Sequence, residues 1–303
     1  MGTSVHVVIH GDPDLADLAE LELRRLEGLW SRFIPTSEIC QLNDHAGQWV
    51  TVSPETIELV ERAILAHALT GGRFDPTVLG DVIRAGYDRS FDLIDGDGPR
   101  DRGPSSDLDQ GVDGIDVDAG RSSVRLPAGV GFDPGGLGKG LAADRVAALL
   151  DAEGVAGALI NLGGDLRATG YGPNGDDWTI DLDPAATGTP LARVSIEHGA
   201  IATSTVLRRR WMVAGTDAHH LIDPASGLPS SSGVVAASVL TAHGWQAEVL
   251  AKAALIAGLD DGLALITSLG ADGLLVDDTG GLHPTPGFTR FLVAPPAPSE
   301  VPS

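Results

Sequence analysis

Cysteine, long apolar runs and basic residues are all scarce in this sequence of 303 residues. Cys40 is its only cysteine, which excludes an intrachain disulfide and a zinc site built from several thiolates. No apolar run approaches the roughly 18 residues that a membrane-spanning helix needs. Lysine and arginine number 20 against 42 acidic residues, and the resulting net charge of −22 repels nucleic acids and anionic membranes. The sequence therefore predicts a soluble globular protein that needs local positive charge or a metal ion to hold a phosphate.

One glycine-rich segment offers such a local charge. Residues 132–144 read FDPGGLGKGLAAD, with a carboxylate at Asp133, a turn packed with glycine and then an apolar helix. Such a turn places backbone N–H groups at a helix N-terminus, where they suit an anion, and Lys139 adds a full charge. The segment matches neither the dinucleotide fingerprint, because Leu141 replaces a glycine, nor the P-loop, because Gly140 replaces Ser or Thr. Phosphate binding is the functional interpretation, and a plain tight turn is the alternative.

Apolar periodicity and turn residues predict the helices and strands. The predicted helices cover residues 12–33, 53–70, 136–150, 247–257 and 261–269. The predicted strands cover residues 5–9, the segment directly before Asp133, and residues 157–162, 179–182, 192–196, 210–213 and 234–240. The strand before Asp133, the next helix and the strand at 157–162 would form one β-α-β unit. We expect a single domain over residues 1–294, with a surface loop or weak hairpin at 88–121 and a disordered Pro- and Ser-rich tail at 295–303.

Several motifs agree in order and spacing with a known family. They are MGT at 1–3, FIPTSEI at 33–39 with Asn43 beyond, GGRFDPTV at 71–78, the glycine-rich segment, NLGGD at 161–165, ATS at 202–204 and HLIDPASG at 220–227. Together they resemble the ApbE family, the FAD:protein FMN transferases, over nearly the whole chain. The resemblance implies an α+β fold with mixed sheets flanked by helices. It also implies an FAD cleft between sub-lobes, lined by the glycine-rich turn, the Phe74-Asp75 loop and the His220 loop.

The resemblance implies a reaction as well. In this family FAD is split at its pyrophosphate, FMN passes to a Thr or Ser hydroxyl of a partner flavoprotein, and AMP leaves. Such phosphoryl transfer needs a base for the hydroxyl proton and cations for the developing charge. Matching positions assign the catalytic roles to His220 and Asp223, with His220 as proton acceptor because an ordinary histidine pKa near 6.5 suits that task. An FAD pyrophosphatase that uses water as acceptor, and an FAD-binding protein without turnover, are the alternatives.

The positions that contact FAD in similar proteins can also be followed here. They correspond to Met1, Phe33, Arg73, Phe74, Asp75, Asp133, Lys139 and Ile222. Without the family, Phe33 and Phe74 would be assigned to the core, Asp75 to a turn and His220 to the surface. Phe33 stands where tyrosine is common in the family, so a hydroxyl is lost while the ring face remains.

The metal site is where this sequence departs most from the family. That site joins a backbone carbonyl of the glycine-rich turn, here Gly136, to an Asp and a Thr in the pattern A-D-x-x-x-T, where this chain has Glu248 and Lys252. A protonated lysine offers no lone pair to a metal. Three outcomes stay open: a surface i,i+4 ion pair, Mg²⁺ held by Glu248 with water in the lost position, or Lys252 as the substitute cation. We expect the dependence on Mg²⁺ to be weakened rather than abolished.

The acceptor protein and the cellular location are only loosely constrained. The family's acceptor pattern is an acidic residue, two others, Ser or Thr, Gly, a small residue and Thr. The nearest segment here, 183–189, is mis-spaced, so we expect a separate acceptor flavoprotein rather than self-modification. The first residues show no basic stretch, apolar stretch or lipid-bearing cysteine, so we expect a cytoplasmic location as the sequence stands. The alternative is an extracytoplasmic, membrane-associated protein with a trimmed N-terminus.

Overall fold

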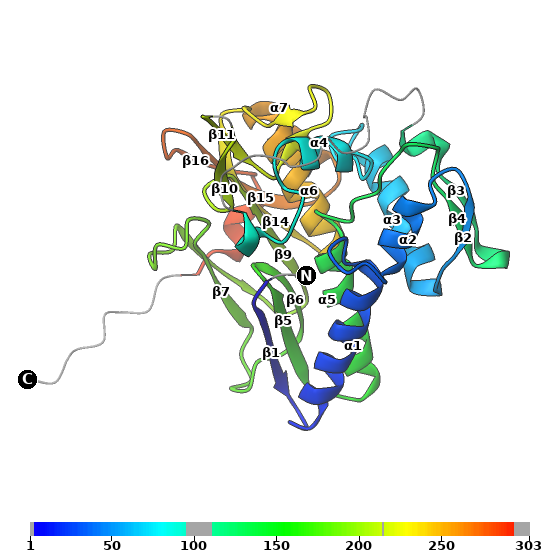
Figure 1. The fold of residues 1–303 in the computed structure, drawn as a ribbon. Coiled ribbons are helices and arrows are strands. Elements are labelled where there is room, and N and C mark those ends of the chain that lie inside the picture. The colour runs from blue at the N-terminus through cyan, green and yellow to red at the C-terminus, as the bar shows by residue number, and fades with distance from the viewer. Residues whose placement is uncertain (1–2, 95–110, 214, 294–303) are drawn as a thin grey trace, which may run out of the picture.

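The fold is organised around a seven-stranded sheet, seen in a computed structural model that describes residues 3–94, 111–213 and 215–293 (Figure 1). In spatial order its strands are β1 (Val5–His10), β5 (Gly157–Leu162), β6 (Asp165–Gly170), β9 (Gly199–Thr205), β14 (Val234–Thr241), β15 (Asp272–Asp277) and β16 (Leu282–Pro284). Each strand pairs antiparallel with its neighbours. Helices flank this sheet, and the predicted α+β class is confirmed. The predicted mixed sheets are wrong, because every strand pair of the described residues is antiparallel.

The two faces of the sheet are covered by different elements. On one face lie α5 (Gly138–Ala152), α6 (Gly244–Ala257) and α7 (Leu259–Ser268), and on the other lies the hairpin of β7 (Trp178–Leu182) and β8 (Ala192–Ile196). Strand β9 displays the alternation that two covered faces require: Ala200 and Ala202 pack in the cluster with α6 and α7, whereas Ile201 packs with the hairpin. The central strands are therefore apolar on both sides.

A smaller group of elements stands beside the sheet, next to α1 (Leu15–Trp30) (Figure 1). It contains α2 (Glu38–Asp44), α3 (Pro54–Leu69) and a three-stranded sheet with β2 (Trp49–Thr51), β4 (Ser123–Arg125) and β3 (Asp116–Asp118) in that spatial order. Helix α3 begins at Pro54 because the Ser53 side chain accepts the Thr56 N–H, at 3.3 Å, and proline needs no partner for a missing N–H. One hydrophobic core cluster joins α1, α3 and α5, and it includes Leu26, Trp30, Leu59 and Leu150.

Short elements complete the fold. They are α4 (Leu79–Arg84), the hairpins β10–β11 (Arg210–Val213 and Thr216–His219) and β12–β13 (Ile222–Asp223 and Leu228–Pro229), and the 3₁₀ turns η1 (Phe91–Leu93), η2 (Val112–Gly114), η3 (Ala119–Arg121) and η4 (Phe288–Phe291). A surface loop or weak hairpin was predicted at 88–121. In its described parts this segment contains η1, η2, β3 and η3. Residues 95–110 and the predicted tail lie outside the described ranges. None of the described helices is long and apolar enough to cross a membrane.

The predicted β-α-β unit is wrong. Before Asp133 the chain makes only an isolated parallel bridge between Gly131 and Val78, and the preceding strand, β4, belongs to the small three-stranded sheet. Val130 and Phe132 are buried in the core without pairing in a strand, and their burial accounts for the apolar pattern that predicted a strand. Helix α1 also ends earlier than predicted, at Trp30. Among the elements that were not predicted are helices α2 and α4 and strands β6, β9, β15 and β16 of the seven-stranded sheet.

A pair of glycines fixes the crossing of α5 and α6. A Cβ atom added to Gly140 would lie 2.2 Å from the backbone oxygen of Gly244, closer than atoms can approach. We expect Gly140→Ala to lower the free energy of unfolding by about 1–3 kcal/mol or more, because the helices must separate. Gly138→Ala is the matched control, since its Cβ would meet nothing nearer than Pro134 at 3.5 Å. Urea denaturation of both variants measures the difference, and equal effects would contradict this account.

Candidate active site

The glycine-rich turn is joined directly to the Phe74-Asp75 loop. The Asp133 N–H donates to the Pro76 carbonyl at 2.7 Å, and the Asp133 carboxylate accepts the Gly135 N–H at 3.0 Å. Gly136 has φ of +97°, a conformation that glycine adopts at little cost, and α5 starts two residues later. Asp75 in turn accepts the Thr77 N–H and hydroxyl. The motifs at 71–78 and 132–144 are far apart in the sequence and therefore form one structural unit only in the fold.

Lys139 forms a buried ion triad at the start of α5. Its ammonium donates both to Asp165 and to Glu248, whose side chains are 8% and 4% exposed. The second Glu248 oxygen accepts the Gly140 N–H at 2.8 Å. Burial alone would lower the pKa of Lys139, but the two carboxylates outweigh it and raise that pKa. Burial also raises the pKa of Asp165 to about 6, although Lys139 opposes the shift. Lys139 is therefore a charged structural centre, and Glu248 holds it there.

Lys252 of α6 lies over the glycine-rich turn. The residue is 6% exposed, its ammonium donates to the Gly135 carbonyl at 3.0 Å, and that ammonium lies 5.4 Å from the centre of the Phe74 ring. Burial lowers the pKa of Lys252, while the charges of Asp133, Glu248 and Asp75 act in the opposite direction. The interpretation of Glu248 and Lys252 as a surface ion pair is wrong, because both are buried and each has another partner.

An arginine held between aromatic rings borders the turn on its other side. The Arg32 guanidinium lies 4.1 Å from the centre of the Phe33 ring and 4.5 Å from that of Tyr87, and its Nε is 3.7 Å from Asp133. The Arg32 side chain is 8% exposed, and its Nη2 is buried with no hydrogen-bond partner in the described part of the chain. Trp211 continues the aromatic row, 5.7 Å from Tyr87. A buried N–H donor without a partner favours a ligand acceptor at this point.

His220 faces the same aromatic row. Its ring lies 6.2 Å from Tyr87, edge to face, and its Nδ1 is buried without a partner among the described residues. Burial holds the pKa of His220 well below its usual value, and the positive charges of Arg209 and Lys252 lower it further. Its neighbour differs: His219 accepts the Leu221 N–H at Nδ1 and donates from Nε2 to the Ser230 carbonyl, so both of its nitrogens are used. His220 is thus neutral near pH 7 and available to take a proton.

The structure gathers most of the predicted site residues and leaves others apart. Arg73 is partly exposed and lies 3.5 Å from Asp261 of α7. Ile222 is fully buried against Val78 and Val82. The Asp223 carboxylate accepts the Ala225 N–H and the Ser226 hydroxyl, which closes its own turn. Met1 lies outside the described residues, and the roles predicted for these four and for the other site residues stay predictions.

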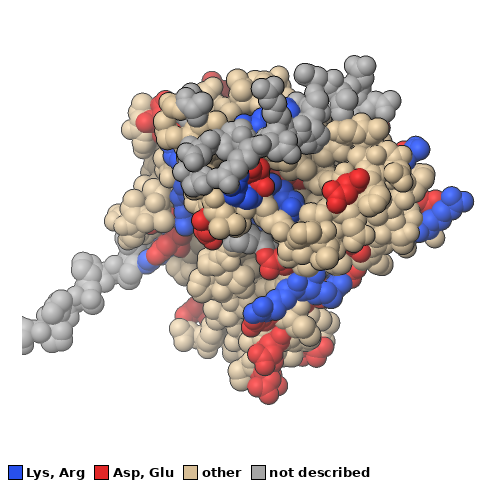
Figure 2. Space-filling model, viewed as in Figure 1, with Lys and Arg blue, Asp and Glu red and all other residues tan. Residues whose placement is uncertain are grey.

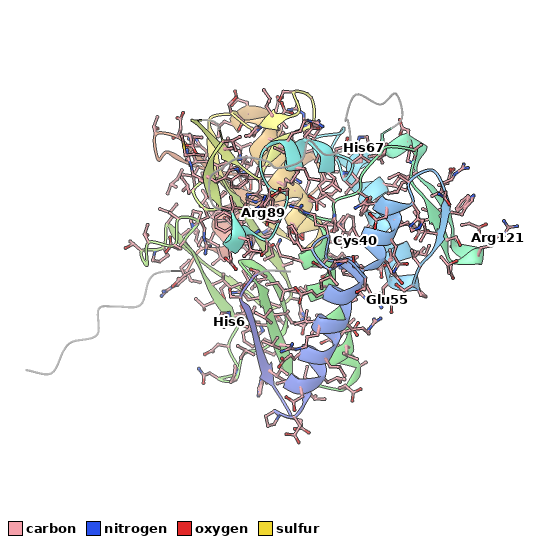
Figure 3. All side chains as sticks on the ribbon, in the orientation of Figure 1. His6, Cys40, Glu55, His67, Arg89 and Arg121 are labelled. Carbon is pink, nitrogen blue, oxygen red and sulfur yellow. The ribbon has the colours of Figure 1, made fainter. Side chains whose placement is uncertain are left out.

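The surface around the site is mixed in charge. Figure 2 shows basic and acidic side chains gathered at the centre of the face that Figure 1 presents. Figure 3 labels Cys40 of α2 and His67 of α3 on the helical side of this area, and the His67 Nε2 atom lies 3.9 Å from Asp75. A cavity of about 580 Å³ lies elsewhere, among α1, α3, α5 and the start of α6. The predicted FAD cleft between sub-lobes therefore stays a prediction.

Three residues of this site were missed from the sequence: Arg32, Tyr87 and Asp165. Arg32 precedes Phe33 directly, and a basic residue beside a motif is a signal in so acidic a chain. Asp165 ends the NLGGD motif but received no role, because only the tertiary structure brings it to Lys139. Tyr87 carried no sequence signal that we can identify.

Comparison with known proteins bears on this arrangement. Residues 1–275 match the ApbE family. The chain belongs to that family. The curated FAD:protein FMN transferase of Treponema pallidum is 29% identical, and the alignment covers 91% of this chain and 82% of that protein. The FAD:protein FMN transferase of Vibrio cholerae is 26% identical, and the alignment covers 96% of this chain and 90% of that protein. The crystal structure of the ApbE protein of Thermotoga maritima superposes with a TM-score of 0.83 at 28% identity, covering 97% of each chain. The flavinyl transferase ApbE of Pseudomonas stutzeri, at 24% identity, shares the fold with a TM-score of 0.81 over 97% of this chain and 95% of that one.

Proposed function

We propose that this protein is an FAD:protein FMN transferase, which moves FMN from FAD to a Thr or Ser hydroxyl of an acceptor flavoprotein. The observation that carries the proposal is the convergence of an unpartnered base nitrogen on His220, an unpartnered Arg32 donor and two buried ammonium groups at one glycine-rich turn. Family membership and the names of the curated relatives support it.

The step follows from this chain's own groups. The acceptor hydroxyl oxygen attacks the phosphorus of the FMN half of FAD and forms a new P–O bond. The P–O bond to AMP breaks, and AMP leaves with that electron pair. His220 takes the hydroxyl proton, since its neutral imidazole has a free Nδ1. The cations beside the turn lower the cost of charge on the phosphate oxygens.

A divalent metal is implied by the family, and the donors around the turn do not fit one. Mg²⁺ prefers about six oxygen ligands at close to octahedral positions. Here Lys252 hydrogen-bonds the Gly135 carbonyl, both Glu248 oxygens accept from Lys139 and Gly140, and the described residues hold no cluster of three or more His, Cys, Asp or Glu suited to a metal. The proposed step therefore uses no metal, which goes further than the weakened dependence on Mg²⁺ that the sequence predicts.

Incubation with FAD and an acceptor domain that carries the Thr motif tests the function. We expect intact-mass spectrometry to show one FMN attached to the acceptor, and AMP to appear in equal amount. An acceptor whose target Thr is replaced by Val is the matched control and should stay unmodified. AMP release without attachment would instead indicate an FAD pyrophosphatase, and bound but intact FAD would indicate a binding protein.

A further inference from the structure

The Lys252 side chain occupies the space that a side chain at position 136 would fill. The Lys252 side chain crosses the turn where Gly136 has no side chain, and a Cβ atom there would lie 2.6 Å from the Lys252 Cδ. The ammonium then reaches the Gly135 carbonyl at 3.0 Å, above the face of Phe74. The ammonium thus lies at the glycine-rich turn and not in solvent.

This buried ammonium has hydrogen-bonding capacity to spare. An ammonium carries three N–H donors, and the bond to Gly135 accounts for one of them among the described residues. Leaving a charged group buried without enough partners is costly, and oxygen atoms of a phosphate satisfy both the charge and the donors. Lys139, by contrast, has its charge compensated by Asp165 and Glu248. Lys252 is therefore the better placed of the two lysines to meet an incoming anion.

The same geometry leaves a divalent metal without ligands at this point. The Lys252 ammonium lies on the Gly135 carbonyl, next to the Gly136 carbonyl expected at the metal site, and it would repel a second cation placed beside it. Both Glu248 oxygens already accept hydrogen bonds, one from Lys139 and one from the Gly140 N–H. The negative charge of Glu248 therefore compensates Lys139. The lysine and the metal are thus alternatives for one role, and this chain carries the lysine.

We propose that the ammonium of Lys252 is the resident cation of this site, that it binds the pyrophosphate of FAD, and that flavin transfer by this protein is independent of divalent metal. The proposal rests on the proposed function for its kinetic part. Its binding part stands separately, because pyrophosphate recognition by Lys252 does not require that transfer follows.

The sequence makes the binding part easy to test, because Lys139 and Lys252 are its only lysines. Reductive methylation with ¹³C-formaldehyde labels the lysine amines and the N-terminal amine, and the Lys252→Met variant assigns the Lys252 signal. With EDTA present, we expect FAD to shift that signal or to protect Lys252 from labelling. Riboflavin, which has the same ring system without phosphates, should do neither. A Lys252 signal indifferent to FAD would overturn the proposal.

The kinetic part compares transfer with EDTA and with Mg²⁺. We expect the parent protein to attach FMN at the same rate in both, and Lys252→Met to lose about 10²–10³-fold without recovery in Mg²⁺. Lys252→Thr, which offers a neutral oxygen, should gain a response to Mg²⁺. Arg24→Met, which removes an exposed positive charge on α1, should keep the parent rate. Urea denaturation confirms that each variant is folded.

The outcomes separate the two proposals. Transfer that requires Mg²⁺ in the parent, or full activity of Lys252→Met, overturns the role of Lys252 while leaving the transferase intact. Absence of transfer under every condition, together with an FAD-dependent shift of Lys252 in EDTA, overturns the transferase and supports the cation role.

Discussion

Replacing Lys139 with methionine is expected to lower the free energy of unfolding by about 3–5 kcal/mol, one of the largest single losses in this chain. Lys139 is the shared partner of Asp165 and Glu248, and both carboxylates are nearly inaccessible to water. Methionine keeps the length of the side chain but removes the charge, so two negative groups would face each other in the protein interior. Guanidinium denaturation at neutral pH measures the loss.

The surrounding carboxylates supply the control for this prediction. If the loss comes from unpaired charge, then adding Asp165→Asn and Glu248→Gln to Lys139→Met should recover most of the stability, because amides carry no net charge. If it comes instead from poor packing of methionine, the triple variant should be no more stable than the single one. Recovery of less than about a third of the loss would contradict the electrostatic account.

Replacing His220 with asparagine is expected to slow FMN transfer by about 10²–10⁴-fold while FAD still binds. The loss follows from removal of the only base we assign to the acceptor hydroxyl. Single-turnover transfer and a titration of FAD fluorescence measure the two quantities separately. His219→Gln is the matched control next to it: its amide can still donate to the Ser230 carbonyl, and transfer should stay near the parent rate.

The pH dependence gives a second signature of His220. A base works in its deprotonated form, and burial holds the pKa of His220 well below the usual 6.5. The neutral form therefore persists to lower pH, and the fall in transfer rate on acidification should lie below pH 6.5. In His220→Asn the residual rate should lose this acid limb. A limb centred above pH 6.5, or one that is unchanged in the variant, would contradict the assignment.

The local sequence identified the five longest helices and six of the strands, because their signals are short-range. The Ser53-Pro54 start of α3, the apolar periodicity of α1 and α7, and the strands at β1, β5, β7, β8, β10 and β14 all follow from residues within one element. The strand before Asp133 failed because burial of Val130 and Phe132 gives the same apolar pattern as pairing in a sheet. Strand β9 was missed because Gly199, Ala200, Ala202 and Ser204 separate its β-branched residues, and its pairing with β6 and β14 comes from the sheet.

The site divides in the same way. The motifs by themselves determined the family, the glycine-rich turn, the candidate base His220 and the unusual presence of Glu248 and Lys252, because these depend on residue identity and order. Only the tertiary structure decided which charges meet: that Glu248 turns to Lys139 and Gly140, that Asp165 joins them, and that Lys252 lies over the turn on the Gly135 carbonyl. These contacts join α5, α6, β6 and the turn, and side chains so distant in the chain find their partners only through the packing of helices on the sheet.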